Sequence, residues 1–172
     1  YDIPQNEFLI ALQNQNWQNK YQTESDLLHF HNLMEIGVCR RGHGTMRLED
    51  DVVRYESGMI SIIPVNYPHN TIPYIWSYNC WEYLFVDVEQ MLNKMVPGSP
   101  RYVEQMLHQV NQRAIFTNRG KAPELTESIK NIIEIMRRGE PFYQEEAEGE
   151  MLAFLSKIAR ENGNIQGGGS VN

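Results

Sequence analysis

Four side chains in this sequence have the types and the spacing to bind a metal ion or a polar ligand. His29, His31 and Glu35 all carry odd numbers, so a regular strand would direct all three to one face, because strand side chains alternate between two faces. Two imidazoles and a carboxylate on one face form a ligand set suited to Zn, Ni, Fe or Mn. His69, which follows an apolar segment, is a fourth candidate. The sequence therefore predicts a site for a divalent metal or for a polar ligand.

Short strands must position these residues, because the sequence up to about residue 90 alternates in hydropathy and is divided by turn residues. In a strand over 29–40, Met34, Ile36 and Val38 would face away from the two histidines. Many short strands at nearly regular spacing favour a β-barrel or a β-sandwich. Further strands are predicted at 45–48, 52–55, 59–63 and 81–88, with either a strand or a helix at 8–12.

Other roles for the candidate side chains stay open at this point. The histidines could form a hydrogen-bonded polar patch at the mouth of a barrel, and Glu35 could form a salt bridge with an arginine such as Arg47. A buried carboxylate without a partner or a metal would be costly, so Glu35 must be paired in either case. We expect the remaining histidines, His43 and His108, to lie at the surface, in a turn and on a helix.

Helical periodicity replaces the strand pattern after residue 90. Apolar residues recur at helical spacing, and Pro stands at the first position of two of the helices. Two such helices in series can form an antiparallel pair, with one apolar stripe packed on the barrel and the remaining surface in contact with a partner. The alternative is that both stripes belong to the core of the domain itself. The predicted helices span 100–112, 123–138 and 144–162, and Gly139 ends the second one.

Aromatic residues are dense in the segment before the helices. Aromatic faces with a few polar groups suit sugars and ring-shaped ligands, although about half of these residues would serve only core packing. Trp81, Tyr83 and Phe85 share one face of their strand by alternation, so they act together. Tyr74 and Trp76 lie in a loop and could cap the barrel. The full set is Tyr67, Tyr74, Trp76, Tyr78, Trp81, Tyr83 and Phe85.

The overall composition excludes several classes of function. The 172-residue chain has 15 basic and 22 acidic residues, a formal net charge of −7, and no cluster of Lys and Arg that could grip DNA phosphates. We therefore do not expect this segment to bind nucleic acid by itself. There is no apolar run of about 18 residues that would span a membrane, and no signal-peptide pattern at the start. Cys39 and Cys80 lack metal-site spacing and are expected to be buried free thiols, which fits a reducing cytoplasm.

Two stretches of the sequence resemble the two motifs of the cupin family. They match these motifs in order and in separation, which is far more specific than a lone His-x-His pair. The second stretch departs from the family pattern in two places, with Asn66 where Gly is usual and Ile72-Pro73 where a closing Asn is usual. The first stretch reads His29-x-His31-x3-Glu35-x6-Gly42, and the second reads Gly58-x5-Pro64-x-Asn66-x2-His69.

Within the cupins, residues 25–160 are most similar to the N-terminal domain of AraC-type (AraC/XylS) transcription regulators. The resemblance implies a fold that is mainly β with C-terminal α, namely a cupin double-stranded β-helix (jelly-roll barrel) followed by two to three amphipathic helices. It also implies a cytoplasmic homodimer that binds a small-molecule effector and is joined to a helix-turn-helix DNA-binding half absent from this sequence. The matching features are the His-x-His pair before Glu35-Ile36, the Gly-x-Gly turn at 42–44, the aliphatic strand from Gly58 to Pro64 with His69 after it, and the strand at 83–86.

The resemblance divides the chain into three parts. Residues 1–90 would form the effector-binding barrel, 91–163 the helical dimerisation region, and 164–172 the end of a flexible linker. A sugar is the first candidate for the effector. The four motif positions hold a metal in cupin enzymes, and in AraC-type domains they often persist while the barrel binds an organic molecule. The expected ligand-binding residues are His29, His31, Glu35, His69, Trp81, Tyr83 and Arg47, of which the first four are also candidate ligands of a divalent metal.

Two alternatives to effector sensing are kept. A free-standing metal-dependent cupin enzyme of dioxygenase or isomerase type would use the same four residues and leave metal positions open for substrate. The long helical tail, the linker-like Gly167–Ser170 segment and the missing Asn of the second motif argue against it. The other alternative is a dimerisation scaffold with an empty barrel, which no small molecule would stabilise. We expect a sensor that is not an enzyme.

Overall fold

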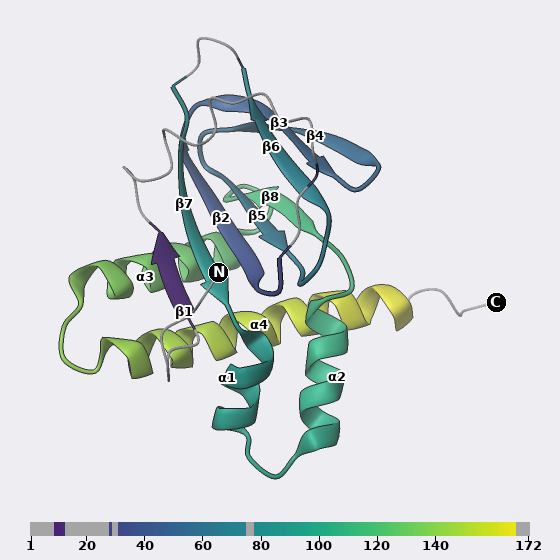
Figure 1. Cartoon of the computed structure of the whole chain (residues 1–172), viewed down its shortest axis with the longest axis vertical. Helices are drawn as coiled ribbons and strands as arrows, with labels where there is room; N and C mark the ends of the chain where they lie inside the picture. Colours follow the sequence, from purple (N-terminus) through teal and green to yellow (C-terminus); the bar gives the residue numbers. More distant parts are fainter. Residues whose placement is uncertain (1–8, 13–27, 29–30, 75–77, 168–172) are drawn as a thin grey trace.

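Antiparallel strands form two sheets that face one another in the computed structural model, which describes residues 9–12, 28, 31–74 and 78–167 (Figure 1). The five-stranded sheet has the spatial order β1 (Leu9–Leu12), β7 (Cys80–Val86), β2 (Met34–Arg41), β5 (Met59–Ile63) and β8 (Ile115–Asn118). The three-stranded sheet has the order β4 (Asp51–Glu56), β3 (His43–Leu48) and β6 (His69–Pro73). The predicted fold of antiparallel β-sheets followed by C-terminal helices is confirmed.

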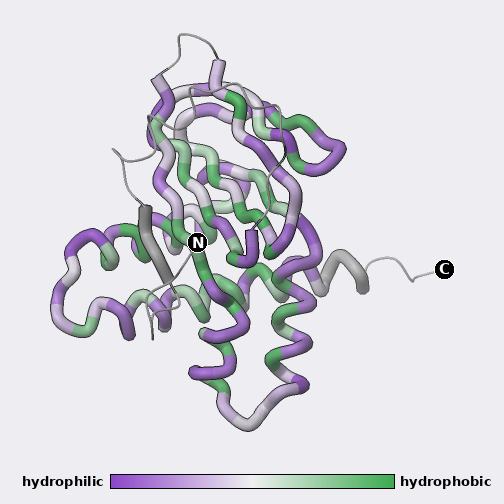
Figure 2. The backbone as a smooth tube through the Cα atoms, in the orientation of Figure 1, coloured by the Kyte–Doolittle hydropathy of each residue, from purple (hydrophilic) through white to green (hydrophobic). Residues whose placement is uncertain are grey.

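The helices α1 to α4 share one apolar core with the five-stranded sheet. Helix α3 ends at Gly139, whose φ of 58° is the left-handed conformation that favours glycine at a helix end, as predicted. Helices α3 and α4 lie side by side as an antiparallel pair (Figure 1), and apolar and polar segments alternate along the helices in Figure 2. The bounds are α1 (Val88–Met95), α2 (Pro100–Val110), α3 (Pro123–Arg138) and α4 (Tyr143–Gly167). No helix within the described part of the chain is long and apolar enough to cross a membrane.

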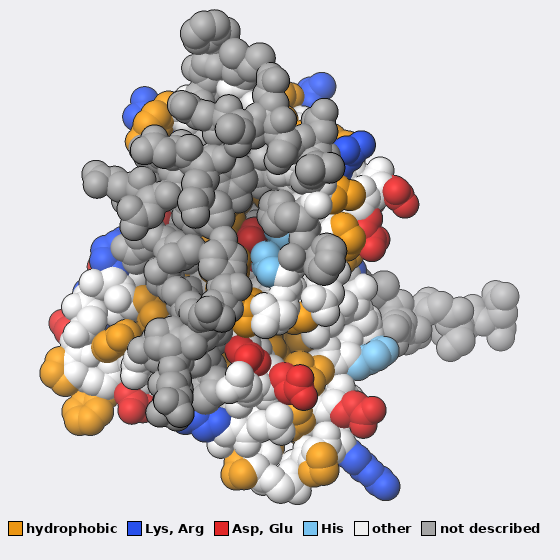
Figure 3. Space-filling view, viewed as in Figure 1, with side chains coloured by type: hydrophobic (Ala, Val, Ile, Leu, Met, Phe, Trp, Pro, Cys, Tyr) orange, Lys and Arg blue, Asp and Glu red, His pale blue; other side chains and the backbone are white. Residues whose placement is uncertain are grey.

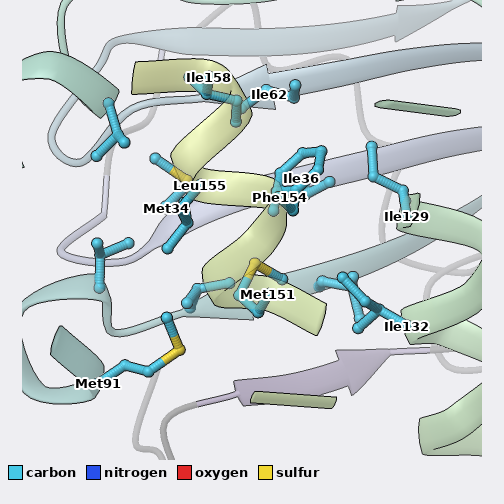
Figure 4. Packing of buried hydrophobic residues seen from close by; sticks show 14 of the residues in the cluster. Met34, Ile36, Ile62, Met91, Ile129, Ile132, Met151, Phe154, Leu155 and Ile158 are labelled. Carbon is cyan, nitrogen blue, oxygen red and sulfur yellow. The ribbon is translucent and has the colours of Figure 1, made fainter. Parts of the chain in front are cut away.

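A large apolar core lies between the five-stranded sheet and the helices, and we call it the sheet–helix core. Its sheet side consists of alternate residues of β2, β5 and β7 together with Ile115 of β8, and its helix side consists of the apolar stripes of all four helices. Figure 4 shows Phe154 and Met151 of α4 packed against Met34 and Ile36 of β2. The stripes of α3 and α4 therefore serve the core of the domain, which was one of the two alternatives that the sequence left open.

A second core fills the space between the two sheets, and we call it the barrel interior. It consists of Leu33, Cys39, Met46, Leu48, Tyr55, Ile63, Trp81, Tyr83 and Phe85. Along β2, Met34, Ile36 and Val38 belong to the sheet–helix core, whereas Glu35 and Cys39 point to the other face. The predicted alternation of these residues is confirmed. Cys39 is a buried free thiol as expected, whereas the free Cys80 is only partly buried.

The structure differs from the sequence-based expectation in three elements. Helix α1 begins at Val88, which was expected to end a strand, and β6 and β8 lie in segments for which no strand was predicted. The barrel sheet thus includes residues of the segment 91–163 that was expected to be helical only. Strand β2 begins at Met34 and not at residue 29, and the segment 8–12 contains the strand β1.

Candidate functional site

Three of the four candidate residues meet at one edge of the barrel interior. Glu35 lies in β2 opposite Phe85 and Ile63, His31 precedes β2, and His69 begins β6. The Nε2 atom of His31 lies 3.0 Å from Glu35 Oε2, and the Nε2 atom of His69 lies 3.4 Å from the same oxygen. The potential ligand atoms of the three residues lie within 4.8 Å of one another. We call these three residues the His–Glu–His cluster.

Backbone carbonyls fix the protonation of both imidazoles. His31 Nδ1 lies 2.8 Å from the carbonyl oxygen of Leu33, and His69 Nδ1 lies 2.8 Å from that of Tyr67. Because a carbonyl oxygen only accepts hydrogen bonds, each Nδ1 must carry the proton and donate it. Each Nε2 can then approach the Glu35 carboxylate only if it is protonated as well, or if a cation lies between the two. The same arrangement orients histidines that ligate metals.

The charge of Glu35 is stabilised inside the protein. Its burial would raise the pKa of the carboxyl group, but the hydrogen bonds and the charge interactions with His31 and His69 outweigh this and lower the pKa to about 2. Burial would lower the pKa of His69, and its hydrogen bond with Glu35 reverses that shift so that the pKa is raised. The cluster therefore holds a carboxylate in contact with two imidazoles, and the carboxylate favours the charged form of His69.

A continuous aromatic surface extends from the cluster along β7. Trp81 and Tyr83 are stacked with ring centroids 5.8 Å apart, and Tyr83 and Phe85 are stacked at 6.1 Å. His31 meets Phe85 edge to face at 5.3 Å, so the imidazole and the aromatic row are in contact. The prediction that these three aromatic residues share one face is confirmed.

One hydroxyl group in the barrel interior is not satisfied by the protein. Ser61 of β5 is fully buried, and its Oγ has no hydrogen-bond partner among the described residues. It lies opposite Gly37, where an added Cβ would come within 2.6 Å of Ser61 Oγ and 3.0 Å of Tyr83 Cε1. A buried hydroxyl without a partner costs about 1–3 kcal/mol, so Ser61 is a polar group that the described part of the protein does not satisfy.

The Gly-x-Gly turn noted in the sequence belongs to the opposite end of the barrel. Gly42 has φ of 105°, and a Cβ there would overlap the side chain of Asn79. At Gly44 a Cβ would come within 2.6 Å of the Tyr55 hydroxyl, which donates a hydrogen bond to Asn79 Oδ1 at 3.1 Å. Both glycines therefore make room for side chains that pack this end of the barrel.

The structure corrects one predicted site residue. Arg47 is exposed on the outer face of the three-stranded sheet, because its neighbours Met46 and Leu48 take the inward positions of β3. It therefore cannot pair with Glu35, whose partners are the two histidines. Trp81 and Tyr83 do line the barrel interior. His29 and Trp76 lie outside the described residues, and Tyr74 and Tyr78 are exposed.

The sequence interpretation missed the groups that orient the cluster, namely the carbonyl oxygens of Leu33 and Tyr67. These are backbone atoms, so no residue type reveals them. It also missed Ser61. A polar side chain within an otherwise apolar strand is the feature of the sequence that could have singled it out. As expected, His43 and His108 are exposed.

The cluster is close to the surface of the molecule. His31 keeps 11% of its side chain exposed, compared with 6% for Glu35 and 1% for His69. In the space-filling view, histidine and acidic surfaces lie side by side near the middle of the face shown (Figure 3). Only the His31 side of the cluster therefore offers a ligand appreciable access within the described structure.

Comparison with solved structures identifies proteins of similar fold. ToxT from Vibrio cholerae is 13% identical, with a TM-score of 0.53 over 91% of this chain and 58% of that one. An apo lysine-to-alanine variant of ToxT from strain SCE256 is 10% identical, with a TM-score of 0.55 over 90% and 56%. The AraC-like transcriptional activator CuxR is 14% identical, with a TM-score of 0.45 over 76% and 42%. The chain thus spans roughly half the length of these proteins.

Sequence comparison places the chain in a family. Among curated proteins, none matches this sequence. The profile of the AraC-like ligand binding domain, however, matches residues 19–155, which include both sheets from β2 onward, the His–Glu–His cluster and most of the helical region. The chain belongs to the family of AraC-like ligand binding domains.

Proposed function

We propose that this chain senses a small molecule inside its barrel and thereby controls a transcription regulator of which it is one part. The observation that carries the proposal is the His–Glu–His cluster, because three titratable side chains are brought together beside an aromatic surface and are oriented by the backbone. Small-molecule sites combine mostly apolar and aromatic walls with a few polar groups in this way. A ligand there would contact His31, His69 and Glu35 with its polar part.

The lining of the barrel narrows the choice of effector. A sugar was the first candidate, and it would stack on Trp81 and Tyr83 while its hydroxyl groups bond to the cluster and to Ser61. Other interior residues, such as Ile63, Met46 and Leu48, are aliphatic or sulfur-containing, and these suit a longer apolar group. One ToxT structure contains an unsaturated fatty acid. We therefore propose a sugar or a molecule with a polar head and an apolar tail as the two classes to compare.

A thermal-shift screen of this chain tests the proposal. One arm contains neutral and acidic sugars, and the other contains saturated and unsaturated fatty acids at concentrations below micelle formation. A true effector raises the unfolding temperature in a concentration-dependent way, because it binds only the folded state. The shift must disappear in Glu35→Gln and persist in Arg47→Ala. A shift of equal size in both variants would show that the compound binds elsewhere and would contradict the proposal.

We also propose that the cluster can hold a divalent metal. Three nitrogen and oxygen ligands with carbonyl-oriented imidazoles fit such a site, and His29 is a fourth candidate from the sequence. A bound metal would act as a Lewis acid that orients a polar group of the effector. Elemental mass spectrometry of the purified chain, with His69→Ala and the exposed-residue control His43→Ala, tests this. Metal that is retained in His69→Ala would contradict the assignment.

Control of DNA binding would require the remainder of a regulator. We propose that a helix-turn-helix half follows this chain, that the protein acts in the cytoplasm, and that two copies associate through the helical region. Sedimentation of the chain with and without the effector tests association. The proposed role is sensing and not catalysis, so turnover of the effector by the purified chain would contradict it.

A further inference from the structure

One turn of the backbone connects the two histidines of the cluster. The turn between β5 and β6 contains Asn66, whose backbone N–H donates to the carbonyl oxygen of His31 at 2.9 Å. The next residue, Tyr67, provides the carbonyl oxygen that accepts from His69 Nδ1 at 2.8 Å. Asn66 has φ of 58°, and asparagine tolerates this left-handed conformation better than most residues. The shape of this turn therefore sets the positions of both imidazoles.

The same turn is held from the helical region by one side chain. Asn111 follows the last residue of α2, and its Oδ1 accepts a hydrogen bond from the backbone N–H of Val65 at 3.2 Å. Its own backbone N–H donates to the carbonyl oxygen of Leu107 at 3.1 Å, so the residue is fixed on the helix end. Because Val65 directly precedes Asn66, a displacement of the Asn111 side chain must also displace the backbone of the turn.

A buried amide of α4 in turn holds the end of α2. Asn162 is only 1% exposed, and its Nδ2 donates to the carbonyl oxygen of Gln109 at 2.8 Å. Its Oδ1 accepts from Arg113 Nε at 2.9 Å. The two partners of Asn162, Gln109 and Arg113, lie before and after Asn111 in the sequence. The end of α2 is therefore attached to α4 by directional polar contacts as well as by apolar packing.

We propose that Asn111 is a positioning residue of the His–Glu–His cluster, and that Asn162 links this positioning to α4. The proposal rests on the proposed function, since it takes the cluster as the ligand site. Hydrogen bonds have narrow limits of length and angle, so a chain of them transmits small displacements that apolar packing would absorb. A ligand that moves His31 or His69 must then shift the turn, Asn111 and the end of α2 together.

The test compares three substitutions in the full chain by ¹H–¹⁵N spectroscopy of the imidazole N–H groups. Asn111→Ala removes the acceptor for Val65, Asn111→Asp retains an oxygen at the same place, and Gln112→Ala removes a neighbouring side chain that bonds to Gln109 Oε1 and not to the turn. We expect solvent exchange of the Nδ1 protons of His31 and His69 to become roughly five- to tenfold faster in Asn111→Ala, corresponding to the loss of about one net hydrogen bond. Asn111→Asp should restore slow exchange, and Gln112→Ala should leave it unchanged.

Several outcomes would overturn the inference. Unchanged imidazole spectra in Asn111→Ala, or equal changes in Gln112→Ala, would show that Asn111 serves only stability. If Asn111→Ala does not fold, Asn111→Gln replaces it, because the longer side chain displaces the oxygen by one methylene, and the same criteria apply. Asn162→Ala should accelerate exchange to a smaller extent, and no change there would remove α4 from the proposal.

This result is separable from the proposed function. Faster imidazole exchange in Asn111→Ala without any effector in the screen would support positioning and contradict sensing. An effector that depends on Glu35, combined with unchanged spectra in Asn111→Ala, would support sensing and overturn the positioning role of Asn111.

Discussion

The sheet–helix core and the barrel interior share the same strands but differ in composition. The buried members of the sheet–helix core are aliphatic residues and methionines, with Phe154 as their one aromatic ring among the described residues. The barrel interior contains a row of three aromatic rings, an unpaired hydroxyl and, at its edge, the His–Glu–His cluster. The first composition supports stability through non-directional packing, and the second offers directed contacts to a ligand.

The difference arises residue by residue along β2 and β7. Ile36 and Leu84 belong to the sheet–helix core, whereas their neighbours Glu35 and Phe85 belong to the ligand side. The two roles are therefore separated by the pleat of a strand and not by distance along the chain. Substitutions on the two sides should separate stability from ligand binding.

The largest expected effect is on the sheet–helix core. Phe154→Ala should lower the free energy of unfolding by about 3–5 kcal/mol, because it leaves a cavity in a fully buried site. Urea denaturation measures this, with Phe142→Ala as the control, since Phe142 is 80% exposed. A loss below about 1 kcal/mol, against the range expected for such cavities, would mean that this core repacks and is not the main source of stability.

Gly37→Ala should have an intermediate effect on stability and should also weaken effector binding. The added methyl group would overlap Ser61 Oγ and press on Tyr83 and Trp81, so we expect a loss of about 1–3 kcal/mol from overpacking. It should also weaken effector binding, because the interior becomes narrower. Urea denaturation combined with calorimetric titration checks both, and full affinity in this variant would place the ligand away from Gly37.

His31→Ala should cost less stability but remove ligand binding. The imidazole is partly exposed and makes hydrogen bonds to the Leu33 carbonyl oxygen and to Glu35, so we expect a loss of about 0.5–1.5 kcal/mol. The midpoint of urea unfolding and the effector-induced thermal shift are measured on the same sample. If the thermal shift survives in full, the cluster is not the contact point of the effector.

Arg47→Ala should have the smallest effect. The side chain is exposed on the outer face of β3, so its removal should change the free energy of unfolding by less than about 0.5 kcal/mol. Effector affinity should be unchanged as well, and calorimetric titration measures it. A clear loss of affinity would mean that the outer face of the three-stranded sheet takes part in binding.

Periodicity made much of the fold predictable. The bounds of β5 and α3 agree with the prediction, because an apolar run before Pro64 and a helical stripe between Pro123 and Gly139 are unambiguous. Strand β8 was missed because four residues are too few to establish a period. Strand β6 was missed because its proline and its polar residues are typical of a loop, and only its pairing with β3 makes it a strand.

The candidate site was predictable in residue type but not in geometry. Alternation placed Glu35 correctly, and the motif spacing added His69, yet His31 reaches the carboxylate from the segment before β2 and not from a regular strand. Alternation applied to β3 would also have excluded Arg47 from the ligand site, since Met46 and Leu48 occupy the inward face of this strand. The contacts that orient the imidazoles use the backbone carbonyl oxygens of Leu33 and Tyr67, and residue type gives no information about the position of these atoms.

The central claim is that the effector binds in the barrel against the His–Glu–His cluster, and one measurement tests it most directly. The compound that gives the largest thermal shift is titrated calorimetrically into the wild-type chain and into Glu35→Gln, which keeps the shape of the side chain and removes its charge. We predict a loss of affinity of about tenfold or more, the factor expected when a charged hydrogen-bonding group is removed from a buried site. Equal affinity for the two proteins would contradict the claim and would move the ligand site away from the cluster.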